Sequence, residues 1–92
     1  MIKTLIEIQN ELGLHARASA KLMRESSRYA SEILLSDTEG KEVNAKSIMG
    51  VMTLGARLGS KLMLTVNGED EHEATNGIVK LINDKFGEHD DV

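Results

Sequence analysis

The chain opens with the segment Ile2-Lys3-Thr4-Leu5-Ile6-Glu7-Ile8. Its even-numbered residues are all β-branched and share one face of an extended chain, so the segment predicts a strand over 2–8 with one buried face. The next residues, Asn10-Glu11-Leu12-Gly13, are typical of a turn, and helix-forming residues follow from Ala16 to Arg28. A strand, a tight turn and a helix are therefore expected in immediate succession.

The remainder of the chain continues this exchange of short strands and helices. We expect strands over 32–36 and 41–44 joined by a turn at 37–40, a short helix over 47–54, a strand over 61–66 and a final acidic-headed helix. The expected buried stripe of the first helix comprises Ala16, Ala20, Leu22, Met23 and Ser27, and that of the last helix Ala74, Ile78, Leu81, Ile82 and Phe86. Gly77 interrupts the last helix without a reason visible in the sequence, and the tail from Glu88 to Val92 is expected to fray.

The order of these elements, βαββαβα, predicts an α+β two-layer sandwich. A four-stranded antiparallel sheet would bury one face under three helices and leave the other face in water. With 92 residues, the chain is expected to form a single domain over 1–92. The alternation of residues does not fix the order of the strands.

Composition narrows the classes of function. A net charge of −4 and only two aromatic residues, Tyr29 and Phe86, argue against a nucleic-acid-binding surface. The chain has no cysteine, no apolar run of membrane-spanning length and no signal-peptide pattern, so we expect a cytoplasmic protein without disulfides. His72 and His89 are interpreted as solvated, and His89-Asp90-Asp91 is weak as a metal site, so neither a metal nor a cofactor is expected.

The most informative motif for function is Gly13-Leu14-His15-Ala16-Arg17. It places His15 at the N-cap position of the first helix, beside free backbone amides and the positive end of the helix dipole. Such a helix end binds anions, and Arg17 adds a permanent positive charge in the same turn. One hypothesis is therefore that His15 carries a phosphoryl group. The alternative is a surface histidine or a modest helix cap, since Ser, Thr, Asp or Asn would cap better.

A second motif lies about thirty residues further along the chain, Asn44-Ala45-Lys46-Ser47-Ile48-Met49-Gly50-Val51-Met52, followed by Leu54-Gly55. Together with the first motif and the Gly68-Glu69-Asp70-Glu71 start of the last helix, it closely resembles HPr, the histidine-containing phosphocarrier family of the bacterial phosphotransferase system. The resemblance covers essentially the whole chain. It implies an antiparallel sheet ordered 1-4-2-3 with three helices on one face.

The resemblance also implies residue roles. His15 would accept a phosphoryl group from enzyme I at Nδ1 and pass it to IIA proteins or domains, while Arg17 and the amides of Ala16, Arg17 and Ala18 would hold that group. The protein would then be a stoichiometric transfer intermediate, not an enzyme, and a monomer. Ser47 matches a regulatory serine that an HPr kinase/phosphorylase modifies in some bacteria. Its simpler interpretation is an N-cap, and the two roles are compatible.

In the family, the residues that match Ile48, Met49 and Met52 form an exposed apolar patch that docks enzyme I and IIA proteins, and Arg24 and Arg28 would border it. Methionine suits a surface that accepts several partners. The alternative is that Met49 belongs to the core, as Val51 and Leu54 are expected to do.

One position departs from the family pattern: Ala18 stands where a proline commonly follows the His-Ala-Arg triplet. The His-Ala-Arg-Ala-Ser form resembles proteobacterial members, including the nitrogen-related branch. Two other functions therefore remain open. One is a regulatory phosphoprotein that acts mainly through phosphorylation-dependent partner binding, and the other is a small-ligand regulatory domain, which would have no need of His15.

Overall fold

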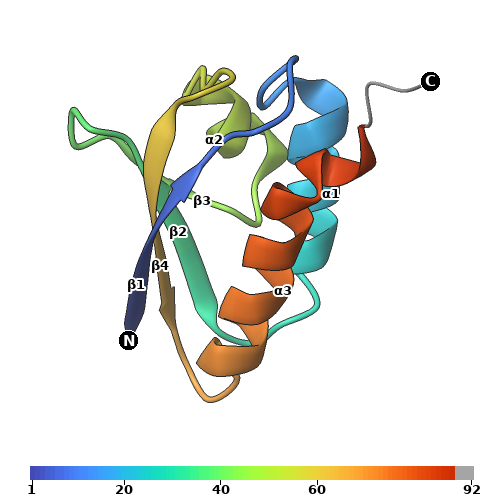
Figure 1. Ribbon diagram of the computed structural model, residues 1–92. Coiled ribbons are helices and arrows are strands. Elements are labelled where there is room, and N and C mark those ends of the chain that lie inside the picture. Colours follow the sequence, from blue (N-terminus) through green and yellow to red (C-terminus); the bar gives the residue numbers. More distant parts are fainter. Residues whose placement is uncertain (89–92) are drawn as a thin grey trace.

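A four-stranded antiparallel sheet forms one layer of the structure and helices cover one of its faces (Figure 1). This computed structural model describes residues 1–88. The elements along the chain are β1 (Ile2–Glu7), α1 (Ala16–Ser26), β2 (Glu32–Ser36), β3 (Glu42–Asn44), α2 (Ile48–Thr53), β4 (Lys61–Asn67), α3 (Glu71–Asn83) and the 3₁₀ turn η1 (Lys85–Gly87). The sheet order is β1-β4-β2-β3. The predicted α+β sandwich and the strand order implied by the resemblance are both confirmed.

The register of the sheet decides which side chains enter the core. In the pairing of β1 with β4, Ile6 lies opposite Leu62, and in the pairing of β2 with β4, Leu35 lies opposite Leu64. All four side chains are buried. Leu5, paired with Met63, is on the other face and is exposed to solvent. The predicted alternation along β1 is therefore correct.

The buried face of α1 differs from the predicted one. The fully buried residues of this helix are Ala18, Ser19, Leu22 and Ser26. Only Leu22 belonged to the predicted stripe, while Ala16 and Ser27 are exposed. The physical reason is that small residues face inward where α1 contacts α2 and α3, so close approach of backbones, and not hydrophobicity, selects the buried face.

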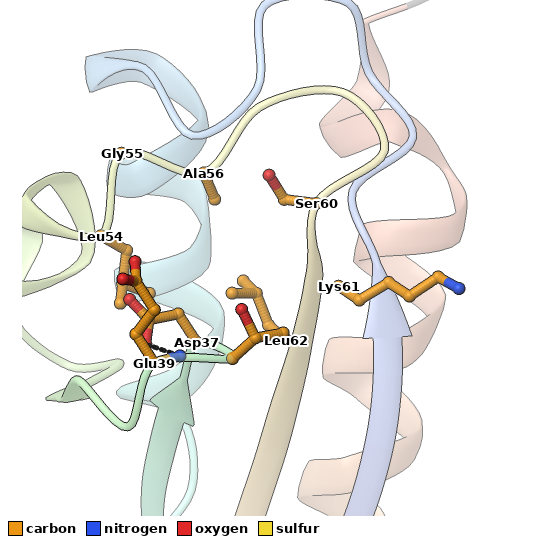
Figure 2. A pocket seen from close by; sticks show the side chains of 9 residues that line it. Asp37, Glu39, Leu54, Gly55, Ala56, Ser60, Lys61 and Leu62 are labelled. Carbon is orange, nitrogen blue, oxygen red and sulfur yellow. Dashed lines mark hydrogen bonds between the residues drawn. The ribbon is translucent and has the colours of Figure 1, made fainter.

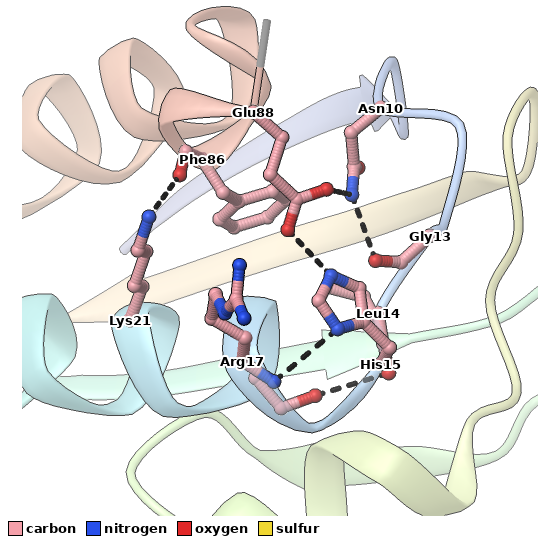
Figure 3. A network of polar contacts seen from close by, with 9 residues as sticks. Asn10, Gly13, Leu14, His15, Arg17, Lys21, Phe86 and Glu88 are labelled. Carbon is pink, nitrogen blue, oxygen red and sulfur yellow. Dashed lines mark hydrogen bonds and ion pairs between the residues drawn. The ribbon is translucent and has the colours of Figure 1, made fainter. Parts of the chain in front are cut away.

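Phe86 is buried, as predicted, but it does not lie on the last helix. The helix ends at Asn83, and Phe86 reaches the core through a turn in which Lys85 and Phe86 both adopt positive φ, 56° and 54°. This turn leads Glu88 back over the start of α1 (Figure 3), so the expected fraying is wrong at Glu88. Residues 89–92, with the weak His89-Asp90-Asp91 motif, lie outside the described residues.

Candidate functional site

His15 is the N-cap residue of α1, as the sequence predicted. Its backbone is extended, its carbonyl oxygen accepts from the Ser19 amide at 2.9 Å, and its ring Nδ1 accepts from the Arg17 amide at 3.3 Å. The preceding loop is fixed at Gly13, whose φ is +65° and whose added Cβ would stand only 2.5 Å from the carbonyl oxygen of Ala56. Glycine at this position therefore lets the loop pack closely enough to present His15 at the helix end.

The other ring nitrogen of His15 is held by Glu88. Nε2 lies 2.5 Å from Glu88 Oε2, and both side chains are partly buried. The Arg17 amide can only donate and the Glu88 carboxylate can only accept, so the two contacts together make Nδ1 the acceptor of the neutral ring and assign the proton to Nε2. The hydrogen-bond network thus leaves the lone pair of His15 on Nδ1, facing the start of α1 (Figure 3).

Glu88 is itself fixed by Asn10. The buried Asn10 amide group donates from Nδ2 to Glu88 Oε1 at 2.9 Å and to the Gly13 carbonyl at 2.8 Å. Burial would raise the pKa of Glu88, but the hydrogen bonds from Asn10 and His15, and the charges of His15 and Lys21, outweigh it and hold the pKa below its usual value. Glu88 is therefore a carboxylate near neutral pH. Neither Asn10 nor Glu88 was predicted as a site residue.

Arg17 and the first amides of α1 complete this end of the helix. The Arg17 side chain is exposed, and within residues 1–88 its guanidinium makes no hydrogen bond or ion pair. In the same part of the chain, the amides of Ala16 and Ala18 have no backbone acceptor, because the first such bond of the helix runs from Ser19 to His15. These amides, the dipole and Arg17 form a site suited to an anion beside Nδ1.

Ser47 is the N-cap of α2. Its Oγ accepts from the Gly50 amide at 3.0 Å, and the residue is exposed. The capping role is therefore present in the structure.

The residues of the predicted docking patch, Ile48, Met49 and Met52, lie on α2, which packs against α1. Met49 is 73% exposed, Met52 is also exposed and Ile48 is half-buried. Val51 is fully buried and Leu54 packs against the core, as expected. The alternative that Met49 belongs to the core is wrong.

Two further exposed leucines, which the sequence analysis did not single out, are Leu12 (71% exposed) and Leu58 (56% exposed). Leu12 lies in the loop between β1 and α1, and Leu58 lies in the loop between α2 and β4. The two loops are in contact, because the Leu14 amide donates to the Ala56 carbonyl oxygen. The sequence could have indicated them, because a leucine within a turn has no core to enter and is expected to be exposed.

The two arginines expected to border the docking patch differ in their surroundings. Arg24 is exposed, while Arg28 forms an ion pair with Glu25 at 3.1 Å and lies 5.9 Å from the centre of the Tyr29 ring. The charge of Arg28, just beyond the end of α1, is thus partly balanced by Glu25 in the last turn of that helix, and Arg24 is the better-placed of the two for a partner.

A shallow cleft of about 210 Å³ lies between the β2–β3 turn and the loop that enters β4 (Figure 2). Its lining includes the acidic residues Asp37 and Glu39, and none of the predicted site residues. Asp37 Oδ1 accepts from the amides of Glu39 and Lys41, so this carboxylate holds the turn. The start of α1 at His15 does not line this acidic cleft.

Two searches of the described part of the chain concern other classes of site. No group of three or more His, Cys, Asp or Glu side chains in residues 1–88 is arranged to hold a metal ion. No helix in this range has the length and apolar character needed to cross a membrane.

Comparison with known proteins agrees with this geometry. The family model "PTS HPr component phosphorylation site" matches residues 2–84. Phosphocarrier protein HPr of Xylella fastidiosa is 47% identical over 96% of this chain and 98% of its own length. The crystal structure of HPr from Thermoanaerobacter tengcongensis superposes with a TM-score of 0.92 at 45% identity, covering 97% of this chain and 99% of that one.

A related protein with a different name has the same fold. Crh of Bacillus subtilis, a catabolite repression protein solved as a swapped dimer, superposes with a TM-score of 0.74 at 36% identity, covering 92% of this chain and 97% of that one. The match to the family model, the extent of sequence identity and the shared fold all lead to one assignment. The chain belongs to the HPr family of phosphocarrier proteins of the phosphotransferase system.

Proposed function

We propose that His15 accepts a phosphoryl group from phosphorylated enzyme I on Nδ1 and passes it to a IIA protein or domain. The observation that carries this proposal is the orientation of the ring. Nε2 is bound to Glu88, while Nδ1 presents its lone pair to the amide-rich start of α1. Membership of the family supplies the phosphocarrier role.

The transfer needs no cofactor. The lone pair of Nδ1 forms the new nitrogen–phosphorus bond while the bond from phosphorus to the donor breaks, and that electron pair returns to the donor. The proton on Nε2 stays in place, so the phosphorylated ring carries a positive charge. In the second transfer, the nitrogen–phosphorus electron pair returns to Nδ1 as the acceptor attacks phosphorus.

The phosphoryl oxygens would be held by Arg17 and by the amides of Ala16, Arg17 and Ala18. A helix end contributes about 0.3–1 kcal/mol to holding a negative charge at an exposed site. That modest stabilisation suits a carrier, because a stronger anion site would retain the group and slow its transfer. Positioning of donor and acceptor in line is then the task of the partner proteins.

Partner recognition would use the docking patch. An exposed, flexible methionine surface on α2, which packs against the helix that His15 caps, can contact several different partners. Arg24 and Arg28 would border the contact and attract acidic surfaces. Ser47 opens the same helix, so phosphate added there by an HPr kinase/phosphorylase would introduce negative charge into the contact.

In this role the protein is consumed and regenerated once per transfer, acts as a monomer and works in the cytoplasm, where enzyme I and the IIA proteins would meet it. A second candidate is a regulatory phosphoprotein in which phosphorylation-dependent partner binding is itself the output; the similarity to Crh, a catabolite repression protein, is the observation that keeps a regulatory role open. Both candidates use His15 in the same chemical step.

The test is incubation with enzyme I and phosphoenolpyruvate followed by intact-mass analysis. We expect one acid-labile phosphoryl group in the wild-type protein and none in His15→Ala. His72→Ala is the matched control, because His72 is exposed on α3 and has no proposed role, and it should be labelled fully. Undiminished labelling of His15→Ala would refute the assignment.

A further inference from the structure

We propose that Glu88 is a positioning residue for phosphoryl transfer: its carboxylate holds the Nε2 proton of His15, which keeps Nδ1 as the nucleophile and balances the charge that the ring gains. The inference rests on the proposed function of His15 and adds a residue from the other end of the described chain. The sequence motif around His15 gives no indication of Glu88.

The contact itself is well defined. Glu88 Oε2 lies 2.5 Å from His15 Nε2, although the two residues are 73 positions apart in the sequence (Figure 3). The two nitrogens of imidazole lie on different edges of the ring. The carboxylate therefore approaches the ring on the edge away from Nδ1, so a phosphoryl donor that reaches Nδ1 has only to displace the 3.3 Å hydrogen bond from the Arg17 amide.

Three contacts hold Glu88 in this position. Asn10 Nδ2 donates to its other carboxylate oxygen, and Lys21 Nζ donates to the Phe86 carbonyl oxygen at 2.6 Å. The Phe86 ring is buried in the core. The end of the described chain is thus fixed over α1 by a side chain from the N-terminal loop, one from α1 and one core residue.

The backbone of this segment supports the same conclusion. Lys85 and Phe86 both have φ near +55°, a region that residues with a Cβ rarely adopt. Two such residues in succession persist only where surrounding contacts compensate for the strain, and such strain is frequent at functional sites. Without this turn, α3 would continue in its own direction, and Glu88 would not follow Phe86 back to His15.

The chemical consequence concerns the proton. With Nε2–H donated to a carboxylate, the neutral ring cannot place its proton on Nδ1 without losing a charge-assisted hydrogen bond. When Nδ1 gains the phosphoryl group, the ring becomes cationic, and the adjacent carboxylate stabilises that charge. When the group leaves, Nε2 still holds its proton, so no proton transfer accompanies either step.

The experiment uses the full chain with Glu88→Ala and Glu88→Gln, with Glu11→Ala as the control for loss of one nearby exposed carboxylate. Two readouts are measured: the single-turnover rate of transfer from phosphorylated enzyme I, and the ¹⁵N chemical shifts of the His15 ring, which report which nitrogen carries the proton. Melting temperatures and amide spectra check that each variant is folded.

We expect Glu88→Ala to lower the transfer rate about tenfold, the scale of one hydrogen bond to a charged group. The neutral His15 ring of that variant should populate the tautomer with its proton on Nδ1 more than in wild type, because the long 3.3 Å bond from the Arg17 amide is then the one contact among those described that still favours a proton on Nε2. Glu88→Gln should keep the proton on Nε2, because the amide oxygen still accepts, yet transfer more slowly than wild type since the charge is lost. Glu11→Ala should match wild type in both readouts.

A Glu88→Ala variant with wild-type rate, with a faster rate or with an unchanged tautomer would overturn the inference. A faster rate would mean that Glu88 blocks the site. The tautomer measurement needs no phosphorylation, so it tests Glu88 even if labelling of His15→Ala had refuted the proposed function. The two failures are therefore distinguishable.

Discussion

The hydroxyl group of Tyr29 lies over Gly77, in the space that a Cβ atom at position 77 would occupy. It donates to Glu25 Oε2 at 2.7 Å, and that oxygen is itself only 2.6 Å from the same space. Glycine within a helix costs about 1 kcal/mol relative to alanine. Here it lets α3 approach the end of α1 closely enough to accommodate the Tyr29–Glu25 pair.

The first prediction is a double-mutant cycle on this contact. Gly77→Ala in a Tyr29→Phe background should stabilise the fold by up to about 1 kcal/mol through helix propensity, because the hydroxyl is gone and the Glu25 carboxylate, no longer bound to it, can move out of the space. In the wild-type background, the gain in unfolding free energy from Gly77→Ala should be about 1 kcal/mol smaller, since Tyr29 must move and its hydrogen bond is lost. Urea unfolding of the four proteins measures the coupling. If the effect of the double variant on the free energy of unfolding equals the sum of the two single effects, the contact has no energetic consequence.

Gly77 illustrates what sequence analysis could and could not supply. Strands and helices followed from the period of apolar residues, because one face of each element is buried. The buried face of α1 did not, because Ala18, Ser19 and Ser26 are small or polar and carry no hydrophobic signal. The order of the strands came only from the family resemblance, since alternation within a strand says nothing about its neighbours.

The site was predictable to a similar degree. His15 and Arg17 were found because an N-cap position and a helix start can be located from local sequence. Glu88 was missed because its position depends on a turn at Lys85 and Phe86 that contains no glycine or proline before Gly87, and Asn10 was missed because its role is to bind Glu88. Contacts between residues so far apart depend on the tertiary fold and leave no local pattern.

The second prediction concerns acid stability and Asp70. This carboxylate accepts from the Ser31 hydroxyl at 2.5 Å and from the amides of Ala30 and Ser31, and these hydrogen bonds hold its pKa below the usual value. A carboxyl group with a lowered pKa stabilises the fold above its unfolded-state pKa, and that stability is lost as the pH falls through the folded-state pKa.

Asp70→Asn should therefore melt at a lower temperature than wild type at pH 7. The difference should narrow as the pH falls from about 4, near the unfolded-state pKa, down through the lower folded-state pKa, below which the wild-type carboxyl group is also neutral. Thermal melts across this range measure it, with Glu69→Gln as an exposed neighbour for control. If the difference in melting temperature between wild type and Asp70→Asn stayed constant with pH, the negative charge of Asp70 would not be what stabilises the fold.

The third prediction tests the docking patch. Met49→Asp should weaken binding to enzyme I by roughly 1–3 kcal/mol, because a charge in an apolar contact loses its hydration, while the melting temperature stays close to wild type. Leu5→Asp is the control, because Leu5 is also an exposed apolar residue but lies on the open face of the sheet. Calorimetric titration measures both. Equal losses in the two variants would remove Met49 from the contact.

The fourth prediction separates the core role of Phe86 from its role at the site. Phe86→Ala should destabilise the fold by about 3–5 kcal/mol, since the ring is fully buried. Phe86→Leu should cost less and keep the fold intact for transfer measurements. If the buried ring is what brings Glu88 to His15, the His15 ring of the leucine variant should carry its proton on Nε2 in a smaller fraction of molecules than in wild type. Unchanged ¹⁵N shifts of the ring would mean that Asn10 and Lys21 hold Glu88 in place without the phenylalanine ring.

The last prediction is that Ser47→Asp slows phosphoryl transfer to His15 while the fold is kept. Ser47 caps α2 by accepting from the Gly50 amide, and aspartate caps a helix equally well and interacts favourably with its dipole. The melting temperature should therefore hold or rise slightly. Ser47→Ala, in contrast, should lose about 1 kcal/mol of stability and transfer at the wild-type rate.

The slower transfer should come from association, because the new charge would lie beside the docking patch in the contact with enzyme I. Repulsion between partly exposed charges is screened at high ionic strength, so added salt should bring the Ser47→Asp rate closer to that of Ser47→Ala. Ser27→Asp, which adds the same charge at the far end of α1, is the control for net charge. Equal rates for Ser47→Asp and wild type at low salt would leave Ser47 with its capping role alone.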